Sequence, residues 1–356
     1  MGKRKKILTM LLTLMFVLFT VGCGNTEGNQ EANNSEDTTV KILLGKESLC
    51  LAPVHIAIIN GYFDEEFNNE GLKYELVEAE VNQAADLLTA RKINAAYGLT
   101  GSLIQPISNG LNISFTTGLH TGCTKYYIKK GSNITSLEDF KGKTIGVPSL
   151  SDSSVVNLKR KLNDIGLNMQ KNSIDVEFVA YAMSDLPAAL DNGAVDVIGI
   201  HDPVATKAEN SYGFTKILDT TTDEKFIDEY CCQAYVSREL IEKNKKGAEA
   251  YTRAMQKAAA FIEADPEEAA RLQIEKGYMS GDAKSNGAIL ASFSYEPSIS
   301  KGRKTFESSF EELQKIGDID SSLDLEKYTE NSYVKLDNVP DGVVYNKETK
   351  TFSEIN

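Results

Sequence analysis

Short apolar runs alternate with segments of helical periodicity from residue 40 to about residue 240. Apolar or alternating runs bounded by glycine, proline or asparagine are typical of strands, whereas apolar positions three and four residues apart are typical of helices. The runs predict strands at 40–44, 72–77, 95–99, 144–147, 174–179, 195–200, 214–218 and 231–236, and the periodic segments predict helices at 52–59, 82–93, 103–108, 153–162 and 184–190. Strands that alternate with helices favour an α/β fold built on parallel sheets.

The stretch from residue 113 to residue 147 departs from this alternation. A β-rich run is interrupted by two glycines placed around a histidine and a cysteine, and it resumes at 125–128 before a fresh strand begins. This order is typical of a strand that completes one domain, passes a ligand loop and enters a second domain. With 231–236 as a second crossing strand, the sequence predicts two α/β lobes with a ligand cleft between them. The predicted boundaries are 38–124 and 231–356 for lobe 1, and 125–230 for lobe 2.

The chain after Ser237 is predicted to be mostly helical. Asp265 followed by Pro266 and Glu268 is a strong helix start, because the carboxylate caps the first turn, proline suits its first position and glutamate suits its third. Near the end, two short β-rich runs flank a polar turn and predict a terminal hairpin over about 343–352.

The first residues have the pattern of an export signal. Four basic residues at 3–6 precede an apolar run at 7–18, which is shorter than the ~20 residues that span a bilayer. The sequence Thr20-Val21-Gly22-Cys23 resembles a lipobox, although Thr20 stands where leucine is usual. We therefore expect a signal peptide over 1–22, lipidation (palmitate) of Cys23, a flexible polar tether up to residue 37, and a protein anchored on the extracytoplasmic face of the cell membrane.

Charge and cysteine content narrow the class of protein further. The formal net charge is −13, and removal of the four basic signal residues takes it to −17, so a nucleic-acid partner is excluded. Besides Cys23 there are four cysteines in more than 300 residues, which is too few for a disulfide scaffold.

Several stretches together resemble the substrate-binding proteins of nitrate/sulfonate/taurine-type ABC importers, a family that includes binding proteins for thiamine pyrimidine precursors. The stretches are Ser136–Val147, Ala189–Asp196, Leu88–Asn94, Asn60–Phe63 and Ala264–Ala269. The resemblance extends over about residues 40–275. It implies a type II periplasmic-binding-protein fold, a monomer that binds a small molecule by hinge closure, and ABC permease and ATPase subunits as partners. It implies neither an enzyme nor a cofactor.

Candidate ligand-binding residues are those at the carboxyl ends of the predicted strands, where open parallel sheets bind ligands. They are Cys50, His55, Thr100, Ser102, His120, Thr121, Cys123, Ser149, Ser151, His201, Asp202 and Cys231. Helices that begin just after these loops offer free N–H groups to an anion. Each serine or threonine alone is better explained as a helix cap.

The three histidines of the chain and the four cysteines after Cys23 all fall in or next to these loops. Imidazole and thiolate are ligands of transition metals. Because the chain has no Cys-x-x-Cys pair, three alternatives remain open: a metal or metal-complex site, a disulfide such as Cys231–Cys232, or free thiols lining the pocket. All arginines fall in the signal or in predicted helices, which weakens a sulfonate ligand, commonly held by an arginine fork.

A solute-binding lipoprotein of an ABC importer is therefore the first expectation. A binder of a metal, a metal complex or a thiamine pyrimidine precursor is the alternative. A sensory lipoprotein and a pyrimidine-synthase-like enzyme are less favoured.

Overall fold

The computed structural model describes residues 39–355, which belong to one compact unit. The predicted signal peptide, the predicted lipidation site Cys23 and the predicted tether lie outside the described residues. Within 39–355, the helices are all too short or too polar to cross a membrane.

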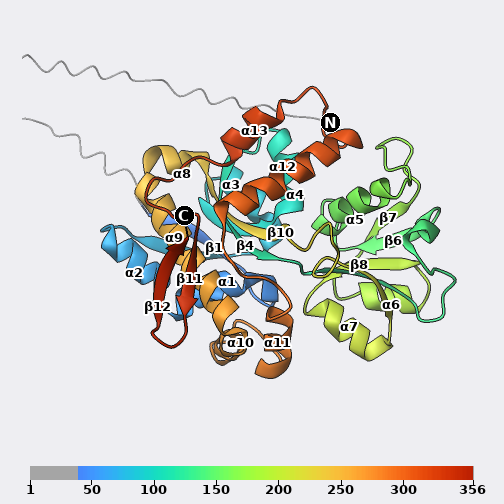
Figure 1. Ribbon diagram of the computed structural model, residues 1–356, viewed down its shortest axis with the longest axis horizontal. Helices are drawn as coiled ribbons and strands as arrows, with labels where there is room; N and C mark the ends of the chain where they lie inside the picture. The colour runs from blue at the N-terminus through green and yellow to red at the C-terminus, as the bar shows by residue number, and fades with distance from the viewer. Residues whose placement is uncertain (1–38, 356) are drawn as a thin grey trace, which may run out of the picture. The chain divides into compact units, whose positions relative to one another are not determined.

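The first of two five-stranded sheets has the strand order β2-β1-β3-β10-β4 (Figure 1). Its strands are β1 (Val40–Leu44), β2 (Tyr74–Glu78), β3 (Ala95–Leu99), β4 (Ile113–Thr121) and β10 (Tyr230–Ser237). β1 pairs in parallel with β2 and β3, whereas β10 is antiparallel to β3 and β4. Because β1 and β3 are nearly continuous apolar runs, both faces of this sheet are buried.

Helices from both ends of the described chain pack around this sheet. One apolar core gathers α1 (Ala52–Ile59), α2 (Tyr62–Asn69) and α9 (Lys245–Ala264), and another gathers α3 (Ala84–Thr89), α4 (Thr100–Ser108) and α12 (Ile299–Lys315). α9 is alanine-rich on its buried side, so it lies close against α1.

The second sheet has the order β7-β6-β8-β5-β9. Its strands are β5 (Thr124–Ile128), β6 (Thr144–Val147), β7 (Glu177–Ala180), β8 (Val197–His201) and β9 (Thr215–Asp219). β6 is parallel to β7 and β8, and β5 runs antiparallel between β8 and β9. The helices connecting these strands are α5 (Ser153–Asp164), α6 (Leu186–Asp191) and α7 (Val204–Tyr212).

The chain passes from the first sheet to the second between β4 and β5, and it returns between β9 and β10. The first crossing consists of Gly122 and Cys123, whose φ angles are 73° and 86°. A left-handed backbone is ordinary for glycine but uncommon for cysteine. A Cβ on Gly122 would also lie 2.5 Å from the Thr221 side chain. This position therefore requires glycine for two reasons, the left-handed backbone and the lack of space for a side chain.

The rest of the chain is helical before it ends in a hairpin. The helices are α8 (Arg238–Lys243), α9, α10 (Pro266–Glu275), α11 (Ala283–Leu290), α12 and α13 (Leu325–Ser332), and the hairpin is β11 (Gly342–Asn346) with β12 (Thr351–Ile355). The predicted start of α10 is confirmed, because the Asp265 side chain accepts from the Glu268 N–H. The predicted hairpin is confirmed as well.

Two local predictions differ from the structure. The helix predicted at 82–93 is a 3-10 turn (Val81–Gln83) followed by the short α3, and the left-handed Arg91 lies in the turn that follows it. Thr100, predicted to cap α4, is its first residue, and its hydroxyl donates to the Tyr230 carbonyl instead.

Candidate functional site

Four thiols and two imidazoles gather beside the first crossing, and we call them the thiol–imidazole cluster. Its members are Cys50, Cys123, Cys231, Cys232, His120 and His201. All are buried except the partly exposed Cys231, and none of the cysteines forms a disulfide. The sequence placed these residues in separate loops, and the fold brings them to one place.

The first sheet explains how three of these residues meet. Cys50 lies in a 3-10 turn (Leu49–Leu51) shortly after β1, His120 lies near the end of β4, and Cys232 is opposite His120 on β10. The pairing of β10 with β4 shifts register between Tyr230 and Cys232. Such a bulge re-aims side chains, so the adjacent Cys231 and Cys232 both reach the cluster although neighbours on a regular strand point to opposite faces.

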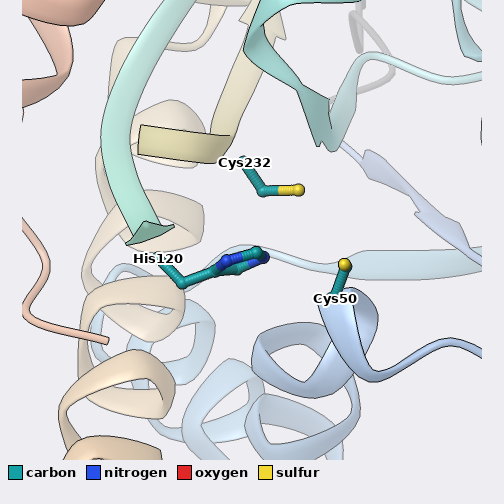
Figure 2. A group of neighbouring side chains, drawn as sticks. All are labelled: Cys50, His120 and Cys232. Atoms are coloured by element: carbon teal, nitrogen blue, oxygen red, sulfur yellow. The ribbon is translucent and has the colours of Figure 1, made fainter. Parts of the chain in front are cut away.

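Cys50, His120 and Cys232 point toward one another (Figure 2). The two sulfurs and one ring nitrogen lie within 4.8 Å of each other. The His120 ring is fully buried, stacked on Phe293 at 5.4 Å and tilted against Tyr295 at 5.0 Å. Its Nδ1 donates to the Thr121 carbonyl at 3.0 Å, whereas Nε2 makes no hydrogen bond to any described residue. In the tautomer with its hydrogen on Nδ1, the lone pair lies on Nε2.

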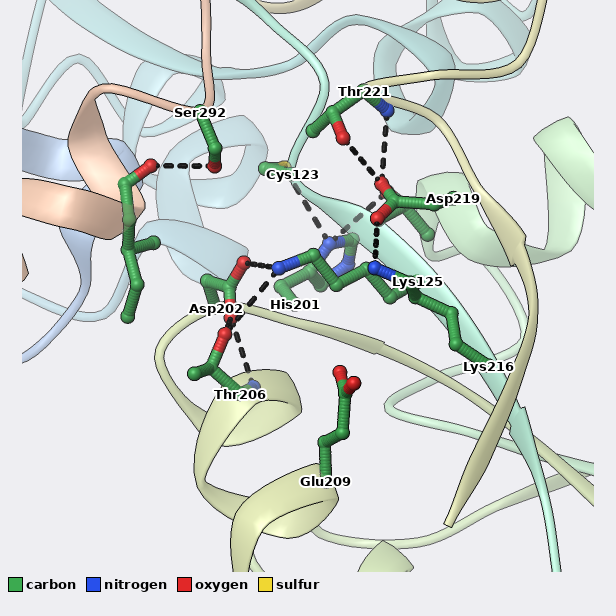
Figure 3. Close-up of polar contacts among 12 residues, drawn as sticks. Cys123, Lys125, His201, Asp202, Thr206, Glu209, Lys216, Asp219, Thr221 and Ser292 are labelled. Atoms are coloured by element: carbon green, nitrogen blue, oxygen red, sulfur yellow. Dashed lines mark hydrogen bonds and ion pairs between the residues drawn. The ribbon is translucent and has the colours of Figure 1, made fainter.

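The other half of the cluster connects the two sheets, and Figure 3 shows two of its members, Cys123 and His201. The Cys123 sulfur lies 2.7 Å from that of Cys231 and 3.6 Å from Nδ1 of His201. His201 ends β8, and its Nε2 is 2.8 Å from an oxygen of Asp152, the N-cap of α5. Burial opposes a charge on His201, but the Asp152 carboxylate outweighs it and raises the pKa of His201 to about 9. The same pair lowers the pKa of Asp152 despite its burial.

The thiols themselves are unequal. Hydrogen bonds from Cys123 and Cys232 hold the pKa of Cys50 well below its usual range, although burial acts against them. For Cys123, burial and its sulfur neighbours raise the pKa well above its usual range. The group therefore favours one thiolate, on Cys50, supported by protonated neighbours.

Asp202 belongs to a separate buried ion pair at the start of α7. Lys125 of β5 donates to it at 2.6 Å, and Thr206 donates through both its N–H and its hydroxyl (Figure 3). With these partners, Asp202 holds β5 and α7 together and does not contact the sulfurs.

Two cavities lie next to the crossings. A small one of about 20 Å³ is lined by Thr100, Arg160, Glu229 and Cys231, among others, and has room for about one water. A larger one of about 310 Å³ has Thr121 and Thr221 beside the crossings and Phe293 and Glu296 across from them. A cavity of this volume is at the lower end of the range for small-molecule sites.

Five predicted site residues lie apart from the cluster and from both cavities. They are His55, Ser102, Ser149, Ser151 and Asp202. His55 is a fully buried helical residue: its Nε2 donates to the Gly45 carbonyl and its Nδ1 accepts from Gln273, each at 2.8 Å. Burial lowers the pKa of His55 to about 4. Because both nitrogens are used, the structure supports a packing role for His55.

Sequence reasoning missed two participants, Asp152 and Arg160. It counted Cys232 among the cysteines near the loops but left it out of the candidate ligand-binding residues. The arginines were expected to lie away from the site, yet Arg160 lines the smaller cavity. Ser153, Asn157 and Arg160 all line it at helical spacing on α5, a signal that could have been used. The Arg160 guanidinium is already engaged, because it donates two hydrogen bonds of 2.7 Å to Glu229 and one of 2.6 Å to Glu312.

Two five-stranded sheets joined by two crossings, with helices on their faces, define the periplasmic-binding-protein fold. Solved structures agree. The aliphatic sulphonate binding protein SsuA of Escherichia coli is 16% identical, with 85% of this chain and 94% of that chain covered and a TM-score of 0.68. The alkanesulfonate-binding SsuA of Xanthomonas axonopodis pv. citri, bound to MOPS, is 15% identical (82% and 97% covered, TM-score 0.66). The nitrate-binding NrtA of Synechocystis PCC 6803 is 14% identical (84% and 86% covered, TM-score 0.66).

The chain belongs to the NMT1/THI5-like family, whose model matches residues 50–269. No curated protein matches the sequence. The similar solved structures share the fold of this chain, but their ligands do not identify the ligand of this chain.

Proposed function

We propose that this protein is the solute-binding component of an ABC importer, which captures a small molecule between two lobes and delivers it to a permease and its ATPase. The observation that carries the proposal is the cavity of about 310 Å³ beside both crossings. Thr121 precedes the first crossing, and Thr221 and Tyr230 lie at the two ends of the second, so movement of one sheet against the other opens or closes this space.

The two lobes of this proposal are 38–124 with 231–356, and 125–230. The left-handed pair Gly122–Cys123 supplies a short connection that can absorb a change of backbone angles. Closure is the signal that the permease recognises. The lipid at Cys23, the extracytoplasmic location, the monomeric state and the absence of catalysis complete the proposal, supported by the sequence pattern of an exported lipoprotein.

The lining of the cavity indicates the class of solute. Asp228, Glu263 and Glu296 face one lysine, Lys301, and no arginine lines the cavity. Such a balance disfavours the sulfonate or nitrate bound by the similar structures. The rings of Tyr230 and Phe293 suit a flat heterocycle. A neutral or cationic heterocycle, of which a thiamine pyrimidine precursor is one example, therefore fits better than an anion.

The test uses the full chain purified in detergent. Thermal unfolding is measured with an aminopyrimidine, an alkanesulfonate and nitrate, and each stabilising compound is taken to calorimetry and small-angle scattering. We expect the heterocycle to stabilise the protein and reduce its radius of gyration, and a Glu263→Gln variant to bind it at least about threefold more weakly. Stabilisation by the sulfonate alone would overturn the solute class. Chemical turnover of the bound compound, or binding without any closure, would overturn the binding-protein function.

A further inference from the structure

We propose that Cys50, His120 and Cys232 form a binding site for a thiophilic metal ion such as Zn²⁺ or Cu⁺. The site goes beyond the proposed function and does not depend on it. All three residues belong to the first sheet or to the turn after β1, so the ion is bound without any movement of the second sheet.

The geometry fits a small ion with sulfur and nitrogen ligands. The three ligand atoms lie within 4.8 Å of one another. Metal–sulfur distances of about 2.3 Å and metal–nitrogen distances of about 2.0 Å place such atoms roughly 3.5–4 Å apart, so side-chain shifts of up to about 1 Å complete the site. Figure 2 shows the three side chains converging from three different elements.

His120 carries the second, independent observation. Its ring is fully buried, and Nε2 is the one ring nitrogen that lacks a hydrogen bond to the described residues. Native proteins rarely leave such an atom without a partner. The Thr121 carbonyl holds the hydrogen on Nδ1, which fixes the tautomer that points a lone pair at the two sulfurs. Phe293 and Tyr295 hold the plane of the ring.

The residue types select the class of ion. Thiolates and imidazole favour Zn²⁺ and Cu⁺ over Mg²⁺ and Ca²⁺, which take oxygen ligands. Two thiolates neutralise a Zn²⁺ ion, which suits a buried and apolar setting that includes Leu119 and Tyr295. Cys123 is a further thiol of the cluster, but its sulfur already lies 2.7 Å from that of Cys231. We therefore assign the three-residue set as the site.

The experiment measures metal binding directly on the full chain in detergent. The protein is stripped of metal, reduced and titrated without oxygen with Zn²⁺ and separately with Cu⁺, each against a chromophoric chelator. Co²⁺ then serves as a spectroscopic probe, because thiolate-to-cobalt charge transfer absorbs in the near ultraviolet. We expect one ion per chain and a charge-transfer band.

Variants distinguish the three ligands from their neighbours. Cys50→Ser, Cys232→Ser and His120→Gln should each weaken binding by about a hundredfold or more, because each removes one coordination bond. The matched control is Cys231→Ala, which removes a thiol of the same cluster outside the set and should stay within about threefold of the wild type. Circular dichroism of the metal-free variants identifies any that fail to fold.

Three outcomes would overturn the site. One is a wild-type protein without the cobalt charge-transfer band. Another is a Cys231→Ala variant that weakens binding as much as Cys50→Ser. A Cys50–Cys232 disulfide in the anaerobically purified protein counts equally against the site. The cobalt spectrum of the wild type requires no variant, so the test remains decisive even if one variant folds poorly. The solute-binding assays do not depend on the metal site, so failure of one proposal can be distinguished from failure of the other.

Discussion

The replacement of Arg160 by methionine tests how the two sheets are held together. Arg160 lies on α5, next to the second sheet, and its side chain is 1% exposed. Glu229, in the second crossing, accepts both terminal N–H groups, and Glu312 of α12 accepts the Nε–H. One guanidinium therefore connects three segments that are far apart in the sequence.

The expected loss in the free energy of unfolding depends on the partners that each carboxylate keeps when the guanidinium is removed. Breaking a fully buried pair by removing one partner costs about 3–5 kcal/mol. Here Glu229 is 18% exposed and Glu312 is 24% exposed, and Glu312 keeps Lys225 at 2.8 Å. Water and Lys225 offset part of the loss, so we expect Arg160→Met to reduce the free energy of unfolding by about 2–4 kcal/mol. Glu229→Gln should cost more than Glu312→Gln, because Glu229 supplies the two-point contact.

The assay is equilibrium urea unfolding followed by circular dichroism, with Arg303→Met as the matched control. Arg303 also contacts two glutamates, but its side chain is 37% exposed. Exposed pairs contribute less than about 1 kcal/mol. If Arg160→Met and Arg303→Met have the same effect, or if Glu312→Gln costs more than Glu229→Gln, the account of this contact is wrong.

Three further changes have defined expectations. His201→Gln should remove a pH dependence of the free energy of unfolding, measured by urea unfolding along a pH series. Because the folded-state pKa of about 9 lies above the ordinary 6.5, the charged His201 stabilises the wild type fully below about pH 6.5. The wild type should lose roughly 3 kcal/mol of this stability as the pH rises through 9. Gly118→Ala should cost about 1–3 kcal/mol in the same assay, because its Cβ would lie 2.5 Å from the ring of Tyr230. Asp265→Ala should cost about 1 kcal/mol, because the N-cap of α10 is lost.

Each of these changes has a result that would count against it. If the stability of the wild type varies with pH in the same way as that of His201→Gln, the charged pair of His201 and Asp152 is refuted. Gly98→Ala is the matched control for Gly118, since its Cβ would meet neighbours only at 3.5 Å and beyond. Equal losses for the two glycine variants would rule out the clash. An unchanged midpoint for Asp265→Ala would show that its side chain does not cap the helix.

The fold could be predicted from the sequence because the patterns that mark its strands and helix ends are local. The apolar runs, the β-rich stretch and the hairpin pattern predicted all the strands of residues 39–355, although the bounds of some differ, and the Gly122–Cys123 break marked the first crossing. The Asp265 cap is equally local, since proline and glutamate follow it at fixed distances. The short α2 was missed because five of its eight residues are charged or asparagine and its apolar face is narrow.

Only part of the site could be predicted from the sequence, because the site depends on which side chains come into contact in the folded chain. His55 and His120 look alike in the sequence, since each follows a strand or a loop. Only packing shows that Gln273 and Gly45 satisfy the first, while the second keeps a free nitrogen. The participation of Cys232 depends on a bulge in β10, and a register shift leaves no mark in the pattern of residue types.

The position of α12 has a consequence for the medium in which the protein works. Besides Arg160, Lys159 and Lys225 reach acidic residues on or just after α12, at 2.7 and 2.8 Å (Figure 1 shows α12 passing α4 toward α5). Separation of α12 from α5 and from the second crossing, which carries Lys225, breaks these ion pairs together and hydrates their charges. Dissolved ions screen the pairs little while they are buried, but stabilise the charges once they are exposed. We therefore expect the proposed cleft to open more readily as the ionic strength of the surrounding solution rises.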